Sequence, residues 1–372
     1  MPLTDDEQTR TAVQVTLKRV LRRIASGEQC PSIAIPRQKD GFPRVLCLDM
    51  NQWIYLSRVH YGLDTNRERM AALESIRQGV ASGRLIVPVM QANVLEASEA
   101  AQRDRARRRR LAAFMIALSS NCCIVHPRQL LRMEVERAIR KHFLQQDVGD
   151  FARERLVRWG VHDAVRTTAA VPDGEELLRS FGPEAVVGIP PEILAGLPQV
   201  LEQAHLEPEM SVLAIVDALS PESIAEGRRI DERAVVALER ARPSDRATRV
   251  RILLGEDAGT LRSALDAMGI QHADFSRWLD GHIETFVADV ASVDVATRLF
   301  MARDRNGEAR VHRNDMKDMF FLEQAIPYGN LVVTEKSWAA LAAAEKLDQR
   351  YATRVLPTLQ MTTALLKADG VV

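Results

Sequence analysis

The order of apolar and polar positions predicts strands that alternate with helices in the first third of the chain. Apolar runs at 45–48, 85–87 and 122–125 have the length of buried strands. Residues 67–81 carry apolar side chains at helical spacing, and residues 92–118 fit one long helix or two short ones. Strands that alternate with helices in this way favour a parallel sheet.

The same alternation returns near the C-terminus. A helix that carries Asp315 and Asp318 precedes an apolar strand at 331–333. A second helix at 337–345 then leads to a strand at 354–356. The two ends of the chain are therefore expected to complete one α/β domain with a central parallel sheet.

The middle of the chain lacks this alternation. From Pro127 to about Arg303 the pattern predicts helices and loops, with no convincing strand. The strongest helix extends from about Phe275 to Met301, because its apolar residues repeat at alternating steps of four and three, apart from Thr297, as in a seam between packed helices. These residues are Leu279, Ile283, Phe286, Val290, Val293 and Phe300.

The chain is predicted to have three parts. Residues 1–40 hold an amphipathic helix and a proline-containing arm. Residues 41–126 and 305–372 form one discontinuous α/β domain, and residues 127–304 form a mostly helical insertion within it.

Composition indicates the number of domains and the cellular compartment more than it indicates the function. The 372 residues suit two domains or one domain with a large insertion, and Lys+Arg and Asp+Glu number 50 each, so net charge indicates no partner. Four cysteines without CxxC spacing are typical of buried thiols in a reducing cytoplasm. Neither a signal peptide nor a membrane span is expected.

Acidic residues follow two of the predicted strands directly. Asp49 comes after the first strand and Glu335 after the strand at 331–333. Glu96 lies shortly after the second strand, while Asp315 and Asp318 are three apart and share one helix face. Because ligands of a parallel sheet bind beyond the carboxyl ends of its strands, all five acids are expected to reach one sheet edge.

Such a cluster of carboxylates predicts a site for Mg²⁺ or Mn²⁺. Clustered acids repel one another unless a cation neutralises them, and hard cations prefer oxygen ligands. Each acid also has a simpler interpretation. Asp49 and Glu335 could cap the helices that follow them, and Glu96 or Asp315 could be solvated surface charges.

A cluster of arginines follows Glu96. We expect substrate contacts from Arg103, Arg107, Arg108 and Arg110, because arginine pairs well with phosphate. The alternatives are docking of a partner and a solvated helix that pairs with acidic neighbours. Trp53 and Tyr55 could stack on a base, although core packing is the stronger expectation. The motifs typical of P-loop NTPases, serine hydrolases and zinc proteases do not occur in the sequence.

Three segments together resemble the PIN-like ribonucleases. Residues 48–53 resemble the opening strand of these enzymes, and residues 88–96 resemble their second acidic segment. Residues 314–318 and 325–336 are similar to the C-terminal block of bacterial PIN-like proteins. The resemblance covers roughly 43–125 and 313–356, and the insertion has no counterpart in it.

The resemblance implies a three-layer α/β/α fold and Mg²⁺- or Mn²⁺-dependent cleavage of RNA. It assigns Asp49, Glu96, Asp318 and Glu335 as metal ligands, with Asp315 as a further acid. The supporting polar groups would be Asn51, Asn314 and Thr334, and Lys336 would join the substrate contacts. Glu335 departs from the more usual Asp, and its longer side chain can coordinate directly or through water.

The function expected from these features is that of a cytoplasmic endoribonuclease, acting as a toxin or in phage defence. A regulatory partner or antitoxin would restrain it, and it could form oligomers. Two alternatives stay open at this point. One is a catalytically inactive PIN-like scaffold that binds RNA or protein, and the other is a structure-specific DNA nuclease.

Overall fold

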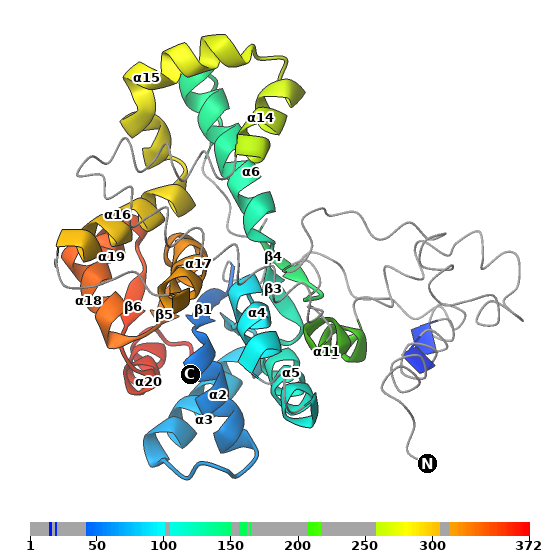
Figure 1. Ribbon diagram of the computed structural model, residues 1–372. Coiled ribbons are helices and arrows are strands. Elements are labelled where there is room, and N and C mark those ends of the chain that lie inside the picture. The colour runs from blue at the N-terminus through cyan, green and yellow to red at the C-terminus, as the bar shows by residue number, and fades with distance from the viewer. Residues whose placement is uncertain are drawn as a thin grey trace, which may run out of the picture.

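The protein has a mixed α/β fold that is mostly helical, with a parallel four-stranded sheet in the order β2-β1-β5-β6 (Figure 1). A computed structural model describes residues 42–100, 105–149, 156–161, 207–216, 258–305 and 313–372, and also 15, 16, 19, 20 and 164. The strands are β1 (Arg44–Leu48), β2 (Leu85–Ile86), β5 (Leu331–Val333) and β6 (Arg354–Leu356). All four strands expected at these places are confirmed.

The centre of the sheet joins segments that are far apart in the sequence. β1 pairs in parallel with β5, from Leu46 opposite Leu331 to Leu48 opposite Val333. β1 also pairs with β2, and β5 pairs with β6, both in parallel. The two ends of the chain therefore build one sheet, as the sequence predicts.

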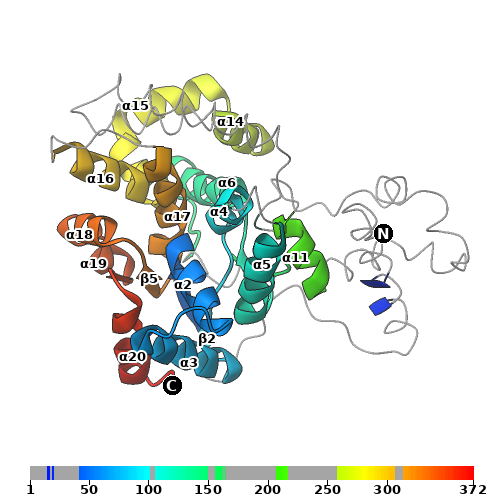
Figure 2. The same cartoon turned by 60° about the horizontal axis from the view of Figure 1, so that its bottom comes forward.

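Helices cover both faces of this sheet (Figure 2). Successive strand residues point to opposite faces, so Leu46 and Leu48 enter one hydrophobic cluster while Val45 and Cys47 enter another. The first cluster contains residues of α2 (Met50–His60), α3 (Arg67–Ala81), α4 (Gln91–Ala100), α5 (Arg105–Ser119) and α20 (Leu359–Ala368). The second contains residues of α16 (Ala291–Arg305), α17 (Arg313–Tyr328), α18 (Lys336–Ala344) and α19 (Leu347–Tyr351).

Local signals set most of these helices. Asn66 caps α3 by accepting the backbone N–H of Arg69 at 3.0 Å, and the buried Leu73 and Ile76 of that helix face the core. The segment 92–118 forms two helices, α4 and α5, rather than one.

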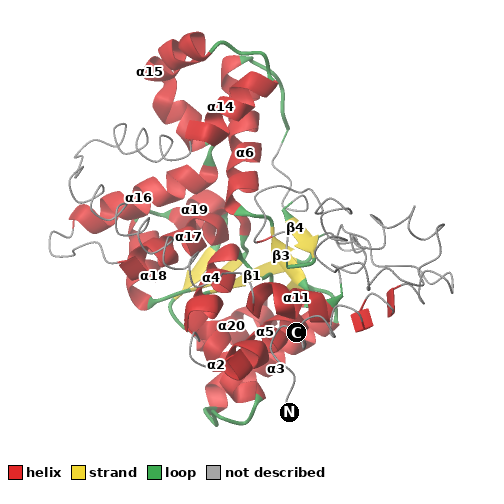
Figure 3. Ribbon diagram, turned by 45° about the vertical axis from the view of Figure 1, so that its right-hand side comes forward, coloured by secondary structure: helices red, strands yellow, loops and turns green. Residues whose placement is uncertain are grey.

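A small antiparallel pair lies beside the main sheet (Figure 3). β3 (Cys122–Ile124) pairs with β4 (Val157–Trp159), and a single parallel bridge joins Val89 to Cys123. The expectation that the middle of the chain lacks strands is therefore wrong at β4. A three-residue strand is too short to show alternation, and its pairing with β3 defines it.

The middle of the chain is otherwise helical in its described parts. It contains α6 (Pro127–Ala138), the π-helix η1 (Ile139–Phe143), α11 (Pro208–Val216), α14 (Ala258–Ala267) and α15 (His272–Ala288). α6, α14 and α15 rise together above the sheet in Figure 1 and share a third hydrophobic cluster.

The single helix expected from about Phe275 to Met301 is instead two helices. α15 ends at Ala288 and α16 begins at Ala291, because the two halves of the apolar seam pack in different places. Phe286 lies in the cluster with α6, whereas Leu299 and Phe300 pack in the cluster with α17. The domain boundaries at 126/127 and 304/305 stay predictions.

The expected N-terminal helix lies almost entirely outside the described residues. Of the described ones, Val20 is buried, and Arg19 Nη1 lies 2.9 Å from Glu209 Oε2 of α11. Cys47, Cys122 and Cys123 are buried free thiols, as expected, while Cys30 is not described. No helix among the described residues is long and apolar enough to cross a membrane.

Candidate metal centre

Asp49 lies between the end of β1 and the start of α2, at the carboxyl edge of the sheet. Its backbone N–H donates to Val333 O at 3.1 Å, and its Oδ1 accepts the N–H of Gln52 at 3.0 Å. The side chain therefore caps α2, and it is only 7% exposed. The capping role that the sequence left open is confirmed.

Asp318 of α17 and Glu335, between β5 and α18, act electrostatically on Asp49. Burial raises the pKa of Asp49 to about 7, and repulsion from Asp318 and Glu335 adds to the rise. Burial also raises the pKa of Asp318 to about 6, with repulsion from Glu335 and Asp315 in the same direction. We call Asp49, Asp318 and Glu335 the acid site.

Each neighbouring acid has a specific partner. Trp338 Nε1 donates to Asp318 Oδ2 at 2.8 Å, and Asn51 Nδ2 donates to Glu335 Oε1 at 3.2 Å. Glu335 occupies the N-cap position of α18 without a capping hydrogen bond from its side chain.

Asp315 is held by an arginine of α16. Arg303 Nη2 of α16 lies 2.6 Å from Asp315 Oδ2, and both side chains are largely buried. The Arg303 guanidinium also lies 5.7 Å from the ring centre of Trp338, and its charge acts to lower the pKa of Asp318. A fixed positive charge therefore borders the acid site.

Glu96 approaches this edge through its helix. Asn93 of α4 is buried, and its Nδ2 donates to Leu48 O, next to Asp49, at 3.1 Å. Glu96 is three residues further along α4 and so lies on the same helix face as Asn93. α4 also packs against α17, which carries Asp318.

Two of the remaining predicted residues, Thr334 and Lys336, flank Glu335 in the chain. Thr334 is buried, and its backbone N–H donates to Leu356 O at 3.0 Å, while Lys336 is exposed in the first turn of α18. The side chain of Asn314 and all of Arg103 fall outside the described residues. Trp53 is fully buried in the core, so core packing is confirmed for it.

The carboxylate oxygens are the donor type that a hard cation prefers, but the acids do not form a preformed coordination site. Among the described residues, no group of three or more His, Cys, Asp or Glu side chains is placed to hold a metal ion. Burial is the main cause of the raised pKa of Asp49, and repulsion from Asp318 and Glu335 adds to it. Shared ligation would require Asp318 and Glu335 to turn from Trp338 and Asn51.

Sequence reasoning overlooked three residues of this region. Asn93 had a usable signal, because a polar side chain at the third position of a helix can accept the backbone N–H of the residue before the helix, as Asn93 Oδ1 does from Met90 at 3.1 Å. Trp338 also had one, since it lies three residues after Glu335 in the first turn of the next helix. Arg303 had none, because only the packing of α16 against α17 brings it to the acids.

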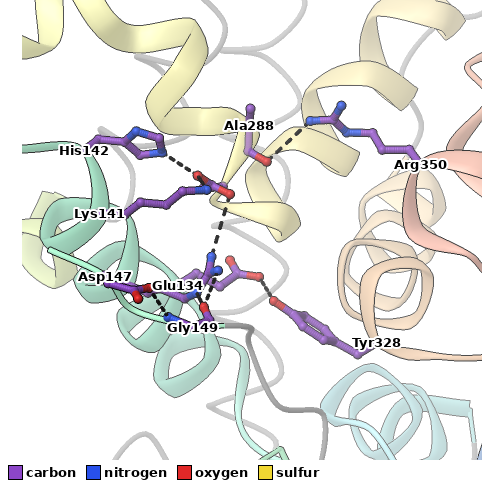
Figure 4. A network of polar contacts seen from close by, with 10 residues as sticks. Glu134, Lys141, His142, Asp147, Gly149, Ala288, Tyr328 and Arg350 are labelled. Atoms are coloured by element: carbon purple, nitrogen blue, oxygen red, sulfur yellow. Dashed lines mark hydrogen bonds and ion pairs between the residues drawn. The ribbon is translucent and has the colours of Figure 1, made fainter. Parts of the chain in front are cut away.

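A second buried acid lies away from the acid site, on α6. Glu134 accepts hydrogen bonds from the backbone N–H and hydroxyl of Ser292. It also accepts from the hydroxyl of Tyr328, at the end of α17 (Figure 4). Burial raises the pKa of Glu134 to about 7. Nearby, Asp289 accepts from Lys141 Nζ at 2.6 Å and pairs with His142. The contacts of Glu134 join α6 to α16 and α17, whereas those of Asp289 join the end of α15 to η1.

Comparison with known proteins gave no match to a family model, to a curated protein or to a solved structure. The PIN-like assignment therefore stays a prediction, carried by the motifs and by the acid site.

The raised pKa values predict how stability depends on pH in a chelator. Between about pH 4 and pH 7, folded Asp49 binds a proton that the unfolded chain, with its ordinary pKa of 3.8, has released. The free energy of unfolding should therefore fall as the pH rises through this window, with Glu134 acting in the same direction. Asp49→Asn should remove the part of this slope that Asp49 causes, which is about 1.4 kcal/mol per pH unit within the window. Urea denaturation at several pH values measures the slope.

A matched variant tests whether Asp49 causes this part of the slope. Glu74 is an exposed acid of α3 whose Oε1 accepts from Gln78 at 3.1 Å. Glu74→Gln should leave the slope unchanged. An equal slope for Asp49→Asn and wild type would show that burial does not raise the pKa of Asp49.

Proposed function

We propose that the protein is a PIN-like endoribonuclease that hydrolyses RNA with Mg²⁺ or Mn²⁺ at the acid site. The observation that supports this most is that Asp49, Asp318 and Glu335, from segments up to 286 positions apart, act on one another at one sheet edge. Helices on both faces of the parallel sheet suit the three-layer α/β/α arrangement of that family. The helical middle would then be an insertion in it.

In this proposal the acids have distinct tasks. Asp49 is the anchoring ligand, because its burial and its cap to Gln52 hold the carboxylate at the sheet edge. Asp318, Glu335 and Glu96 would complete the ligand set, with Asp315 as a further acid. When bound, Mg²⁺ or Mn²⁺ supplies Lewis-acid polarisation of the phosphate and lowers the pKa of a water.

Other side chains orient the site. Asn51 holds Glu335 and Trp338 holds Asp318, and both carboxylates would turn from these partners to share a cation. Arg303 keeps Asp315 in place and adds positive charge beside the phosphate position. Thr334, Asn314 and Lys336 would support the edge. The expected products are 5′-phosphate and 3′-hydroxyl ends.

A binding scaffold without cleavage is the second candidate. The observation that favours it is that Asp315 and Asp318 already have partners, Arg303 and Trp338, without any cation. A toxin or phage-defence role, with a restraining partner, belongs to the first candidate and rests on analogy.

Incubation with labelled substrates separates these candidates. The purified protein should cut single-stranded RNA when Mn²⁺ or Mg²⁺ is added, and a chelator should stop the reaction. Cleavage of DNA but not RNA would indicate the DNA nuclease. Binding of RNA without any cleavage, at all cation concentrations tried, would favour the scaffold.

A further inference from the structure

We propose that a cavity between α2 and α5 holds one nucleotide of a single-stranded RNA whose scissile phosphate lies at the acid site. The inference rests on the proposed function and names where its substrate is held. We call this space the arginine cavity. It has a volume of about 320 Å³, which is at the lower end of the range for small-ligand pockets.

The lining of the arginine cavity combines positive charge with apolar surface. Arg58 of α2 and three arginines of α5 line it, namely Arg107, Arg108 and Arg110. Among the described residues around it, the lining contains no Asp or Glu. Ile54, Leu63 and Leu111 add apolar side chains. An occupant with an apolar face and negative charge fits this lining.

A nucleotide has both properties. Guanidinium groups bind phosphate oxygens, and bases of single strands stack on aromatic rings and on arginine. Tyr61 offers such a ring at the cavity: it is 39% exposed, and its hydroxyl donates to Arg110 O at 3.0 Å. Arg108 is steadied in turn by a 3.3 Å hydrogen bond from its Nη1 to Val216 O of α11.

One face of α2 leads from the acid site to the arginine cavity. Asn51, Ile54, Arg58 and Tyr61 follow at steps of three, four and three, which is the spacing of a single helix face. Asn51 binds Glu335 of the acid site, and the other three line the cavity. At 1.5 Å per residue, Asn51 and Arg58 are about 10 Å apart along the helix. A short single strand laid along α2 therefore reaches both places.

The test measures RNA binding without cleavage, in a chelator. A fluorescein-labelled oligouridine of about ten nucleotides is titrated with wild type, with Arg58→Gln/Arg110→Gln and with Tyr61→Leu. Both arginines are exposed, so their loss should not disturb the core. The double variant should bind about tenfold more weakly at low salt, and the slope of log affinity against log salt concentration should become shallower by about 1.4. Tyr61→Leu should weaken binding with little change in salt dependence.

A control separates the cavity from net charge. Arg67 and Arg128 are exposed and do not line the cavity, so Arg67→Gln/Arg128→Gln removes the same charge elsewhere. This variant should bind the RNA like wild type. In a cleavage assay with Mn²⁺, the cavity variants should raise KM and leave kcat nearly unchanged.

The outcomes distinguish this inference from the proposed function. Cleavage by wild type, with equal RNA binding by wild type and the cavity variants, would overturn the inference alone. Weaker binding by those variants in a protein that never cleaves would support the cavity and refute the nuclease. Polyglutamate that displaces the RNA, binds wild type more tightly and depends on the same arginines would assign the cavity to an acidic protein partner.

Discussion

Asp49→Asn is expected to lower the rate of RNA cleavage at least about 100-fold while the protein stays folded. The amide keeps an oxygen that can accept the N–H of Gln52, and Asn is as good a helix cap as Asp. It removes the negative charge that a cation needs. Initial rates with Mn²⁺ measure the loss, and circular dichroism with urea denaturation reports the fold.

Two comparisons make this prediction specific. Glu74→Gln, on the exposed surface of α3, should cleave at the wild-type rate. Asp49→Ala should lose both cleavage and the cap, and so be less stable than Asp49→Asn by about 1 kcal/mol. Cleavage by Asp49→Asn at the wild-type rate would refute the nuclease proposal, because Asp49 is its anchoring metal ligand.

Glu134→Ala is expected to lower the free energy of unfolding by about 3 kcal/mol at pH 7.5. The change leaves the N–H and hydroxyl of Ser292 and the hydroxyl of Tyr328 without their acceptor, in a place that excludes water. It also opens a space between α6 and α17. Glu134→Gln keeps the volume and one acceptor oxygen, so its loss should be smaller. Urea denaturation measures both.

A neighbour on the same helix serves as the control. Glu136 pairs with Arg132 one turn away, at 2.7 Å, and both side chains are partly exposed. Surface ion pairs of this kind contribute little, so Glu136→Ala should cost less than about 1 kcal/mol. Equal losses for Glu134→Ala and Glu136→Ala would mean that the buried contacts of Glu134 do not stabilise the fold.

The two acids differ in what their burial achieves. Both have pKa values raised to about 7, mainly by burial. Glu134 accepts three hydrogen bonds, and its contacts join helices. Asp49 accepts hydrogen bonds from Gln52, and Asp318 and Glu335 repel it. A raised pKa alone would not separate them, whereas the chemistry of their surroundings does.

Much of the sheet and its acids could be predicted because their signals are local. β1 and β5 are continuous apolar runs bounded by polar residues, which is the pattern of strands buried on both faces. An acid that directly follows such a strand must lie at the sheet edge, so Asp49 and Glu335 were placed by position alone. The sequence predicts both ends of α3 correctly, because the apolar positions of this helix all lie within one short stretch of the chain.

The predictions were wrong where contacts with distant segments decide how a segment folds, as at the break between α15 and α16 and at β4. The seam from Leu279 to Phe300 is compatible with one straight helix, and nothing near Asp289 forbids it. Asp289 instead binds Lys141 and pairs with His142, and the chain turns there toward α17. β4 is a strand only because β3 offers its edge.

The sequence by itself determined which residues can be strands, which acids end them and which helix faces are apolar, since each depends on spacing over a few residues. The tertiary structure alone decided that α15 ends at Ala288, that Arg303 reaches Asp315 and that Trp338 and Asn51 hold their carboxylates. It also placed the arginine cavity on the same face of α2 as Asn51. Contacts between residues far apart in the chain leave no periodic trace, because they depend on how whole helices pack against the sheet.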